Sequence, residues 1–175
     1  MSAAAEAVPN GTSLPPALAA IKPVQLSFPL PRTSNTRINI HLTIQSTALV
    51  LFVTTTSPEH DAGATAPMGS FVYAMPQNTS HTPSNSSATS PPISTPLYAQ
   101  TPTLDLATRL ARILARKSGR PTYVGNSTSF ASAGLGGSVE EEMEGLSRVV
   151  EVVTGELARV EQVEREAAAA AAVAS

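Results

Sequence analysis

The sequence contains no cysteine and no tryptophan, and aromatic residues make up only 4% of it. The absence of cysteine excludes disulfide bonds, thiolate catalysis and cysteine-based metal sites. With so few aromatic residues, a hydrophobic core has to be built mainly from aliphatic side chains. Charged residues are also scarce, at 14% against roughly 25% in typical globular proteins. Alanine, serine, threonine and proline take their place, which predicts a compact domain joined to uncharged, disordered segments.

The net charge and the apolar runs exclude several classes of partner. A net charge of −2 is too small to indicate nucleic acid or an anionic membrane as the main partner. The most apolar run, Ala48–Val53, is far too short to cross a bilayer. Met1–Asn10 lacks the basic start and the apolar centre of a signal peptide. We therefore expect a cytoplasmic and nuclear protein that binds neither nucleic acid nor membrane.

Hydrophobic periodicity predicts six β-strands. Apolar and polar residues alternate through Val24–Leu30 and Ile38–Gln45, which is typical of strands with one buried face. Pro29 indicates that the first of these strands lies at an edge or ends early. Ala48–Val53 is apolar at every position, as in a central strand covered on both faces. The short link between the second and third strands predicts an antiparallel hairpin. The remaining strands are predicted at Ser70–Met75, Ile93–Ala99 and Pro121–Asn126.

Two helices are predicted after the strands. The first begins at Thr101-Pro102, with threonine as the cap, and ends at Gly119 as the C-cap glycine. The second begins with the capping box Ser138–Glu141. Its apolar residues recur at alternating spacings of four and three, which is a heptad-like stripe: Val139, Met143, Leu146, Val150, Val153, Leu157 and Val160. We expect this stripe to pack on the protein's own sheet, and its C-terminal half, Val153–Val163, to extend beyond the sheet.

The order of these elements predicts an α+β fold. We expect a six-stranded, mostly antiparallel sheet with two helices on one face and the other face available for a partner. Residues 1–22 are interpreted as a disordered tail, 23–155 as the α+β domain, and 156–175 as a helical extension or a frayed alanine-rich tail. A disordered insertion is predicted at 76–92, because its serine, threonine, asparagine and proline residues cannot bury enough apolar area to offset the ordering entropy.

The groupings that carry catalysis or bind ligands are missing from the sequence. The three histidines, His41, His60 and His81, form no HExxH pair and no close trio of metal ligands with acidic residues. No Gly-x-Ser-x-Gly elbow occurs. The glycine-rich segment Gly134–Ser138 precedes a helix but lacks the lysine of a phosphate-binding loop. We therefore predict no catalytic residue, no metal and no cofactor, and a protein that is not an enzyme.

Two sets of residues are candidates for partner binding. Arg109, Arg112 and Arg116 recur at i, i+3 and i+7 on the first helix, either as an ordinary solvated face or as a patch for an acidic partner. The second set comes from the strand that is apolar on both faces, because one face needs a cover that this chain lacks and a partner sheet would provide it. That set is Leu49, Leu51 and Val53.

Several segments resemble the family of the fourth proteasome assembly chaperone. Thr108–Val124 is similar to its helix–turn–strand, in which an alanine- and arginine-rich helix leads into a short strand. Glu140–Glu144 resembles the acidic start of its closing helix, and Ile40–Thr54 its central strands; Tyr73–Pro76 is a weaker match. The resemblance covers roughly residues 22–152, and the sequence departs from the family pattern in its alanine- and proline-rich tails and its insertion.

This resemblance implies a non-catalytic chaperone that forms a heterodimer with a sister chaperone, the third of the set. It further implies that the pair binds proteasome α-type subunits, notably number five, promotes assembly of the 20S proteasome α-ring, and leaves before the particle is complete. The residues themselves leave an alternative open. The chain could instead be a small α+β adaptor or scaffold subunit of a trafficking or signalling complex that dimerises through its sheet.

Overall fold

The structure is a computed structural model that describes residues 23–30, 36–57, 67–77, 91–130 and 139–173. The expected N-terminal tail and most of the expected insertion at 76–92 lie outside the described residues. Ser138, the first residue of the expected capping box, also lies outside them. The boundaries of the expected disordered segments therefore stay predictions.

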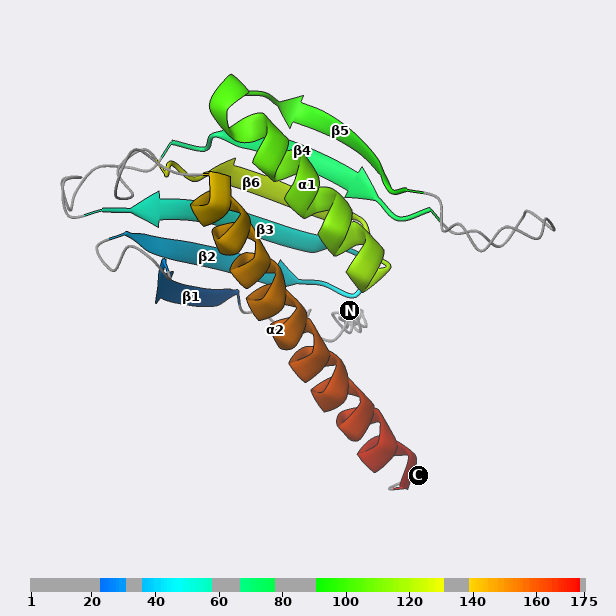
Figure 1. The fold of residues 1–175 in the computed structure, drawn as a ribbon. Helices are drawn as coiled ribbons and strands as arrows, with labels where there is room; N and C mark the ends of the chain where they lie inside the picture. The colour runs from blue at the N-terminus through cyan, green and yellow to red at the C-terminus, as the bar shows by residue number, and fades with distance from the viewer. Residues whose placement is uncertain (1–22, 31–35, 58–66, 78–90, 131–138, 174–175) are drawn as a thin grey trace, which may run out of the picture.

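Six strands form one open sheet in the order β1-β2-β3-β6-β4-β5 (Figure 1). The strands are β1 (Val24–Pro29), β2 (Arg37–Ile44), β3 (Leu49–Thr56), β4 (Ser70–Met75), β5 (Ile93–Tyr98) and β6 (Thr122–Ser127). All neighbours are antiparallel except β3 and β6, which are parallel. The structure confirms the mostly antiparallel α+β sheet, the β2–β3 hairpin and the edge position of β1, which ends at Pro29.

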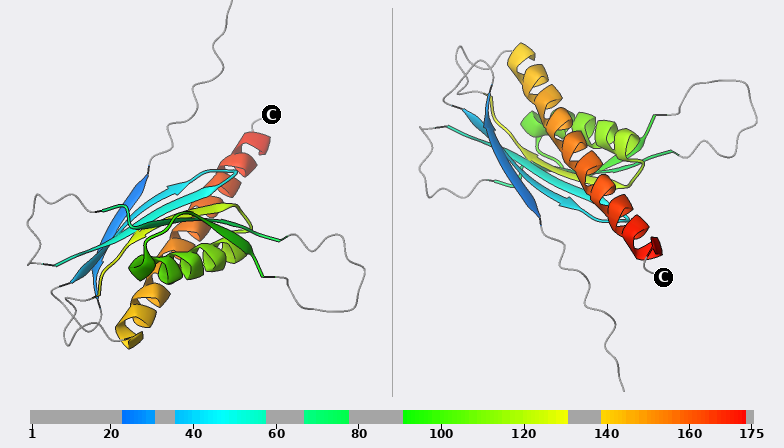
Figure 2. Two further views of the ribbon diagram at one scale, coloured as in Figure 1. Left: turned by 90° about the horizontal axis from the view of Figure 1, so that it is seen from above. Right: turned by 90° about the horizontal axis from the view of Figure 1, so that it is seen from below.

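Two helices, α1 (Thr101–Ser118) and α2 (Val139–Val173), lie on the same face of this sheet (Figure 1 and Figure 2). α1 packs along β4, β6 and β5, while α2 crosses the sheet diagonally and packs on α1 and β2. No helix of the described residues covers the opposite face of the sheet, which we call the open face. No helix in the described part of the chain is long and apolar enough to span a membrane.

The ends of α1 confirm one sequence prediction and correct another. Gly119 adopts the left-handed conformation (φ 63°) and its N–H donates to the Ala115 carbonyl at 3.0 Å, as expected of a C-cap glycine. The prediction that Thr101 caps the helix is wrong, because Thr101 is already helical and the N-cap position is Gln100. Thr103, in the first turn of α1, contacts the N-cap residue instead: its hydroxyl donates to the Gln100 carbonyl at 3.3 Å.

The core lies between the helices and the sheet and is aliphatic, as the composition predicted. Its largest buried side chains are Leu30, Ile38, Leu42, Leu49, Leu51, Leu110 and Leu114. The apolar stripe of α2 is buried through its middle, whereas Val139 and Met143 are exposed. Val163 is 56% exposed, as expected of a segment that extends beyond the sheet, but Val153 and Leu157 are still part of the core, at 0% and 7% exposed. The reason is that α2 packs on α1 as well as on the sheet.

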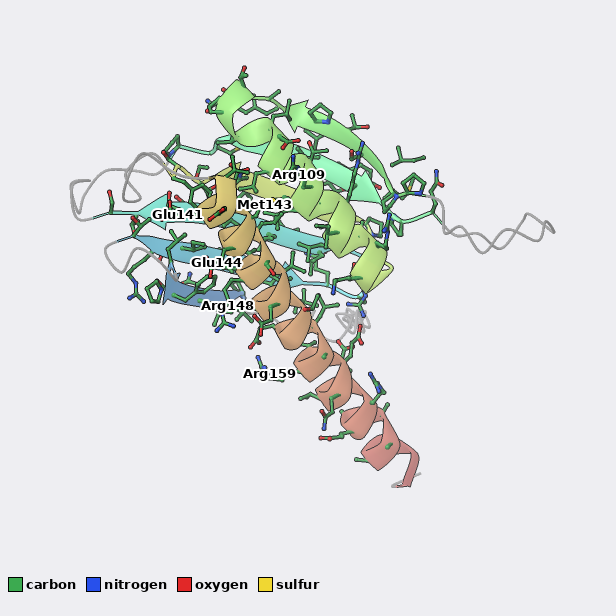
Figure 3. All side chains as sticks on the ribbon, viewed as in Figure 1. Arg109, Glu141, Met143, Glu144, Arg148 and Arg159 are labelled. Atoms are coloured by element: carbon green, nitrogen blue, oxygen red, sulfur yellow. The ribbon has the colours of Figure 1, made fainter. Side chains whose placement is uncertain are left out.

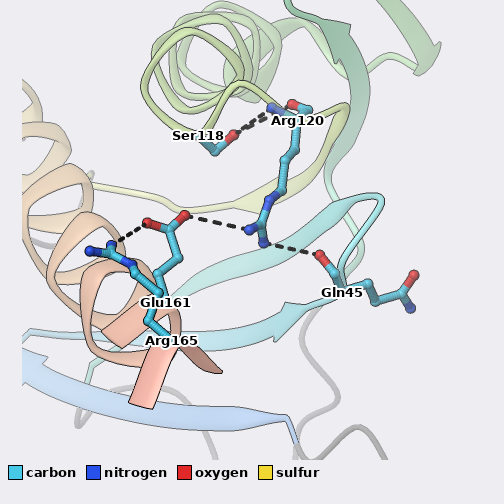
Figure 4. Close-up of polar contacts among 5 residues, drawn as sticks. All are labelled: Gln45, Ser118, Arg120, Glu161 and Arg165. Atoms are coloured by element: carbon cyan, nitrogen blue, oxygen red, sulfur yellow. Dashed lines mark hydrogen bonds and ion pairs between the residues drawn. The ribbon is translucent and has the colours of Figure 1, made fainter. Parts of the chain in front are cut away.

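Arg120 ties the second half of α2 to the rest of the domain (Figure 4). Its Nη2 lies 3.4 Å from Oε1 of Glu161, and its Nη1 donates to the Gln45 carbonyl at 3.2 Å. Glu161 also faces Arg165 at 3.7 Å, one turn further along α2. Because Gln45 belongs to the β2–β3 turn, one guanidinium bridges the turn, the end of α1 and α2.

Candidate partner interface

The strand alternation decides which residues face the helices and which face the open side of the sheet. Leu49, Leu51 and Val53 are 0%, 0% and 2% exposed and lie in the core. The prediction that these three residues meet a partner chose the wrong face of β3. The apolar residues of β3 that point to the open side are Val50 and Phe52, and Phe52 is 40% exposed. Because both sets are apolar, periodicity alone could not show which set the helices cover.

A row of aromatic rings crosses the open face. Phe52 of β3 stacks on Phe71 of β4, with ring centroids 5.9 Å apart and planes 4° apart. Phe71 contacts Tyr123 of β6 at 6.2 Å, and Tyr123 contacts Tyr73 of β4 at 4.9 Å. We call these four residues the aromatic row. The chain has only seven Phe and Tyr residues. The open face therefore holds more than half of them.

Gly125 lies beneath the Phe52–Phe71 end of this row. β6 runs between β3 and β4, and Gly125 is the register partner of both Phe52 and Phe71. A Cβ atom on Gly125 would lie 2.3 Å from Cδ1 of Phe52, closer than side-chain atoms approach one another. The missing side chain therefore gives the two rings the space in which they stack. Sequence reasoning interpreted Gly125 only as one residue of a short strand.

The rest of the open face is poor in charge. None of the six described strands contains an aspartate or glutamate, and their only arginine or lysine is Arg37. Met75 and Ile93 add exposed apolar area beside the aromatic row. The central parts of protein–protein interfaces combine aromatic enrichment with depletion of charge. The open face, with Phe52 exposed and the other three rings partly buried, is therefore the candidate partner interface.

The part of the open face over β1 and β2 is polar but uncharged apart from Arg37. Nε2 of Gln25 lies 3.4 Å from Nδ1 of His41, and Nδ2 of Asn39 donates to Oγ1 of Thr56 at 3.1 Å. Nε of Arg37 donates to Oγ of Ser27 at 3.0 Å. The open face thus has two parts, an aromatic one over β3, β6 and β4 and a polar one over β1 and β2.

The predicted arginine stripe lies on the outer side of α1, away from the aromatic row. Arg109 pairs with Asp105 at 2.8 Å, and its Nη1 donates to Sδ of Met143 at 3.5 Å, where the two helices meet (Figure 3). Nε of Arg112 donates to Oγ of Ser94 in β5 at 2.8 Å. Arg116 is exposed in the last turn. Both predicted sets of partner residues therefore lie on the helix side of the sheet, one inside the core and the other on the outer surface of α1. The role of the stripe stays a prediction.

Three buried polar side chains at one end of the sheet, those of Asn126, Ser70 and Thr103, have structural hydrogen-bond partners. Asn126 is fully buried; its Nδ2 donates to the Thr103 carbonyl at 3.1 Å, and its Oδ1 accepts from the hydroxyl of Thr128 at 2.8 Å. The hydroxyls of Ser70 and Thr103 lie 2.8 Å apart. In the part of the chain that the structure describes, no three His, Asp or Glu residues are grouped as a metal site would require.

Comparison with known proteins identifies the family. The family model described as proteasome assembly chaperone 4 matches residues 37–128, which is more than half of the chain. The chain belongs to the proteasome assembly chaperone 4 family. The part that matches this family runs from β2 to β6 and contains the whole aromatic row, Gly125 and α1. β1 and α2 lie outside the matched residues.

The search of solved structures found a chain from the crystal structure of a chaperone complex for yeast 20S proteasome assembly. It is 15% identical to this member of the family, the match covers 81% of this chain and 95% of that chain, and the TM-score is 0.46. No curated protein matches the chain.

Proposed function

We propose that this chain is a non-catalytic chaperone of 20S proteasome α-ring assembly that works as a heterodimer with a sister chaperone. Membership of the proteasome assembly chaperone 4 family supports this function. The observation that carries the mode of action is the aromatic row on a charge-poor sheet face without helices. A cytoplasmic and nuclear location, and binding of the pair to proteasome α-type subunits, belong to the same proposal.

The open face is suited to packing against a second sheet. Two sheets that pack face to face lie about 10 Å apart and fill the space with the side chains of their inner faces. The rings of Phe52, Phe71, Tyr73 and Tyr123 supply such side chains. No reacting group is needed for this role, because burial of apolar surface alone stabilises the complex.

This arrangement places both helices on the outside of the pair. The stripe of Arg109, Arg112 and Arg116 then stays accessible after the sister chaperone has bound, since it lies on the other side of the sheet. The stripe is therefore available to a carboxylate-bearing surface of an α-type subunit. One face of the sheet would serve the sister chaperone and the helix layer would serve the client.

Affinity capture with three forms of the tagged chain tests whether the sister chaperone binds the open face and the α-type subunit binds the helix layer. From cells of its own organism, the wild-type chain should recover a small sister chaperone together with proteasome α-type subunits. Phe52→Arg places a charge on the open face and should lose the sister chaperone. Arg112→Glu combined with Arg116→Glu should keep the sister chaperone and lose α-type subunits. Recovery of coat or tethering proteins alone would support the adaptor alternative and refute the proposal.

A further inference from the structure

A hollow lies on the open face beside Phe52, at the border between the aromatic and the polar parts. Its volume is about 330 Å³, and its open-face lining consists of Gln25, Ser27, Asn39, His41, Phe52 and Thr54. The lining comes from β1, β2 and β3, so the hollow is separated from Phe71 and Tyr123 by the ring of Phe52. We call it the Phe52 hollow.

The position of the Phe52 ring accounts for the hollow. The ring lies over Gly125 and stacks on Phe71, because Gly125 has no Cβ to exclude it. The ring therefore extends from β3 toward β6 and β4, and the space on the β2 side of β3 is left to a partner. His41 closes that side, with its ring edge-on to Phe52 at a centroid distance of 6.5 Å and an angle of 65°.

The chemistry of the lining selects the kind of side chain that fits. The rings of Phe52 and His41, at 65° to each other, form aromatic walls, and aromatic side chains prefer such edge-to-face and offset neighbours. Amide and hydroxyl groups of Gln25, Asn39 and Thr54 supply neutral hydrogen-bonding partners. No carboxylate, lysine or arginine lines the hollow itself. Arg37 donates to the lining residue Ser27, so a cationic side chain in particular would lose its hydration without gaining an ion pair there.

We propose that the Phe52 hollow receives one aromatic side chain with a polar tip, tyrosine or tryptophan, from the sister chaperone, and that Gly125 keeps the hollow open. This inference rests on the proposed function, since it assumes that the sister chaperone covers the open face. A ring inserted in such a hollow is the kind of anchor that dominates the affinity of many interfaces. Gly125 is then a positioning residue, which acts on the partner through Phe52.

A double-mutant cycle tests the role of Gly125. Gly125→Ala should displace the Phe52 ring and weaken sister-chaperone binding at least tenfold, measured by isothermal titration calorimetry. In the F52V background, which lacks the ring atoms that a Cβ would meet, the same change should weaken binding less than threefold. Equal losses in both backgrounds would overturn the role of Gly125. Circular dichroism and thermal unfolding establish that each variant is folded.

Filling the hollow directly tests its occupancy without changing Gly125. Thr54→Trp places a ring in the hollow and should also weaken binding at least tenfold. Ser147→Trp is the matched control, because Ser147 is exposed on α2, on the other side of the sheet, and it should leave the dissociation constant unchanged. A wild-type dissociation constant for Thr54→Trp would overturn the proposal.

A third measurement separates this inference from the proposed function. p-Cresol, the tyrosine side-chain analogue, should shift the NMR signals of the His41 ring in the free full-length chain, and T54W should abolish the shift. A wild-type chain that binds no sister chaperone would refute the proposed function, while the p-cresol result still decides whether the hollow accepts an aromatic ring. Unchanged His41 signals at millimolar p-cresol would overturn the inference.

Discussion

Leu51 and Phe52 are neighbours in β3 on opposite faces of the sheet, so exchanging each for alanine separates folding from partner binding. Leu51 is fully buried in the core, and Leu→Ala changes at such sites cost about 2–5 kcal/mol of the free energy of unfolding. Phe52 is only partly buried, and its removal from an open face leaves no enclosed cavity, so Phe52→Ala should cost less, about 1–3 kcal/mol with the ring stack included. We therefore expect Leu51→Ala to be the more destabilising change.

The order reverses for binding of the sister chaperone. Phe52 is 40% exposed in the free chain, and of the roughly 200 Å² that an aromatic residue can bury, about 80 Å² is left for a partner to cover. At about 25 cal/mol per Å² this area corresponds to about 2 kcal/mol, or about a 30-fold increase in the dissociation constant for Phe52→Ala. Leu51→Ala should leave the dissociation constant of the folded chain within about twofold, because Leu51 does not reach the open face.

Urea unfolding and isothermal titration calorimetry measure the two quantities on the same protein samples. If Phe52→Ala lowers the free energy of unfolding as much as Leu51→Ala and leaves binding unchanged, the open face is not the binding surface. If Leu51→Ala weakens binding by the folded chain more than Phe52→Ala does, the assignment of the two faces is wrong.

Three further changes have expected outcomes. Gly119→Ala should lower the free energy of unfolding by about 1 kcal/mol, read from a urea transition, because Gly119 has a φ of 63° with free space around it; an unchanged midpoint would contradict the strain argument. Arg120→Ala should speed amide hydrogen exchange in α2 around Glu161 while costing no more than about 1 kcal/mol overall, as its ion pair is partly exposed; unchanged exchange would show that the bridge does not hold α2. Deleting Asn78–Ser90, a low-complexity segment, should leave the sister-chaperone dissociation constant unchanged, and a large loss of affinity in calorimetry would show that the segment binds the partner.

Local signals in the sequence were sufficient for the strands and for the end of α1. The alternation in β2, the short turn at Gln45 and the glycine at position 119 each act within a few residues, so their structural consequences do not depend on distant parts of the chain. The β2–β3 hairpin and the C-cap of α1 were predicted correctly for this reason. The N-cap of α1 was predicted wrongly at Thr101, because several polar residues lie near the start of this helix and each could have been the cap.

The candidate site depends on strand order, which local patterns do not contain. Phe52, Gly125 and Phe71 come into line only because β6 pairs between β3 and β4. In the sequence, each aromatic residue of the row is an ordinary strand residue. The burial of Leu157 likewise follows from packing between two helices rather than from the stripe in α2 alone. The face of β3 was chosen wrongly because both of its faces are apolar.

The central claim is that the sister chaperone covers the open face of the sheet and leaves the helix layer accessible. Because the chain has no cysteine, a single cysteine can be placed on either side, by Tyr123→Cys in the aromatic row or by Ser147→Cys on α2. The rate of maleimide labelling, measured by mass spectrometry with and without the sister chaperone, reports which side is covered. We predict at least tenfold slower labelling of Y123C in the complex and an unchanged rate for S147C. Protection of S147C with an unchanged rate for Y123C would contradict the account.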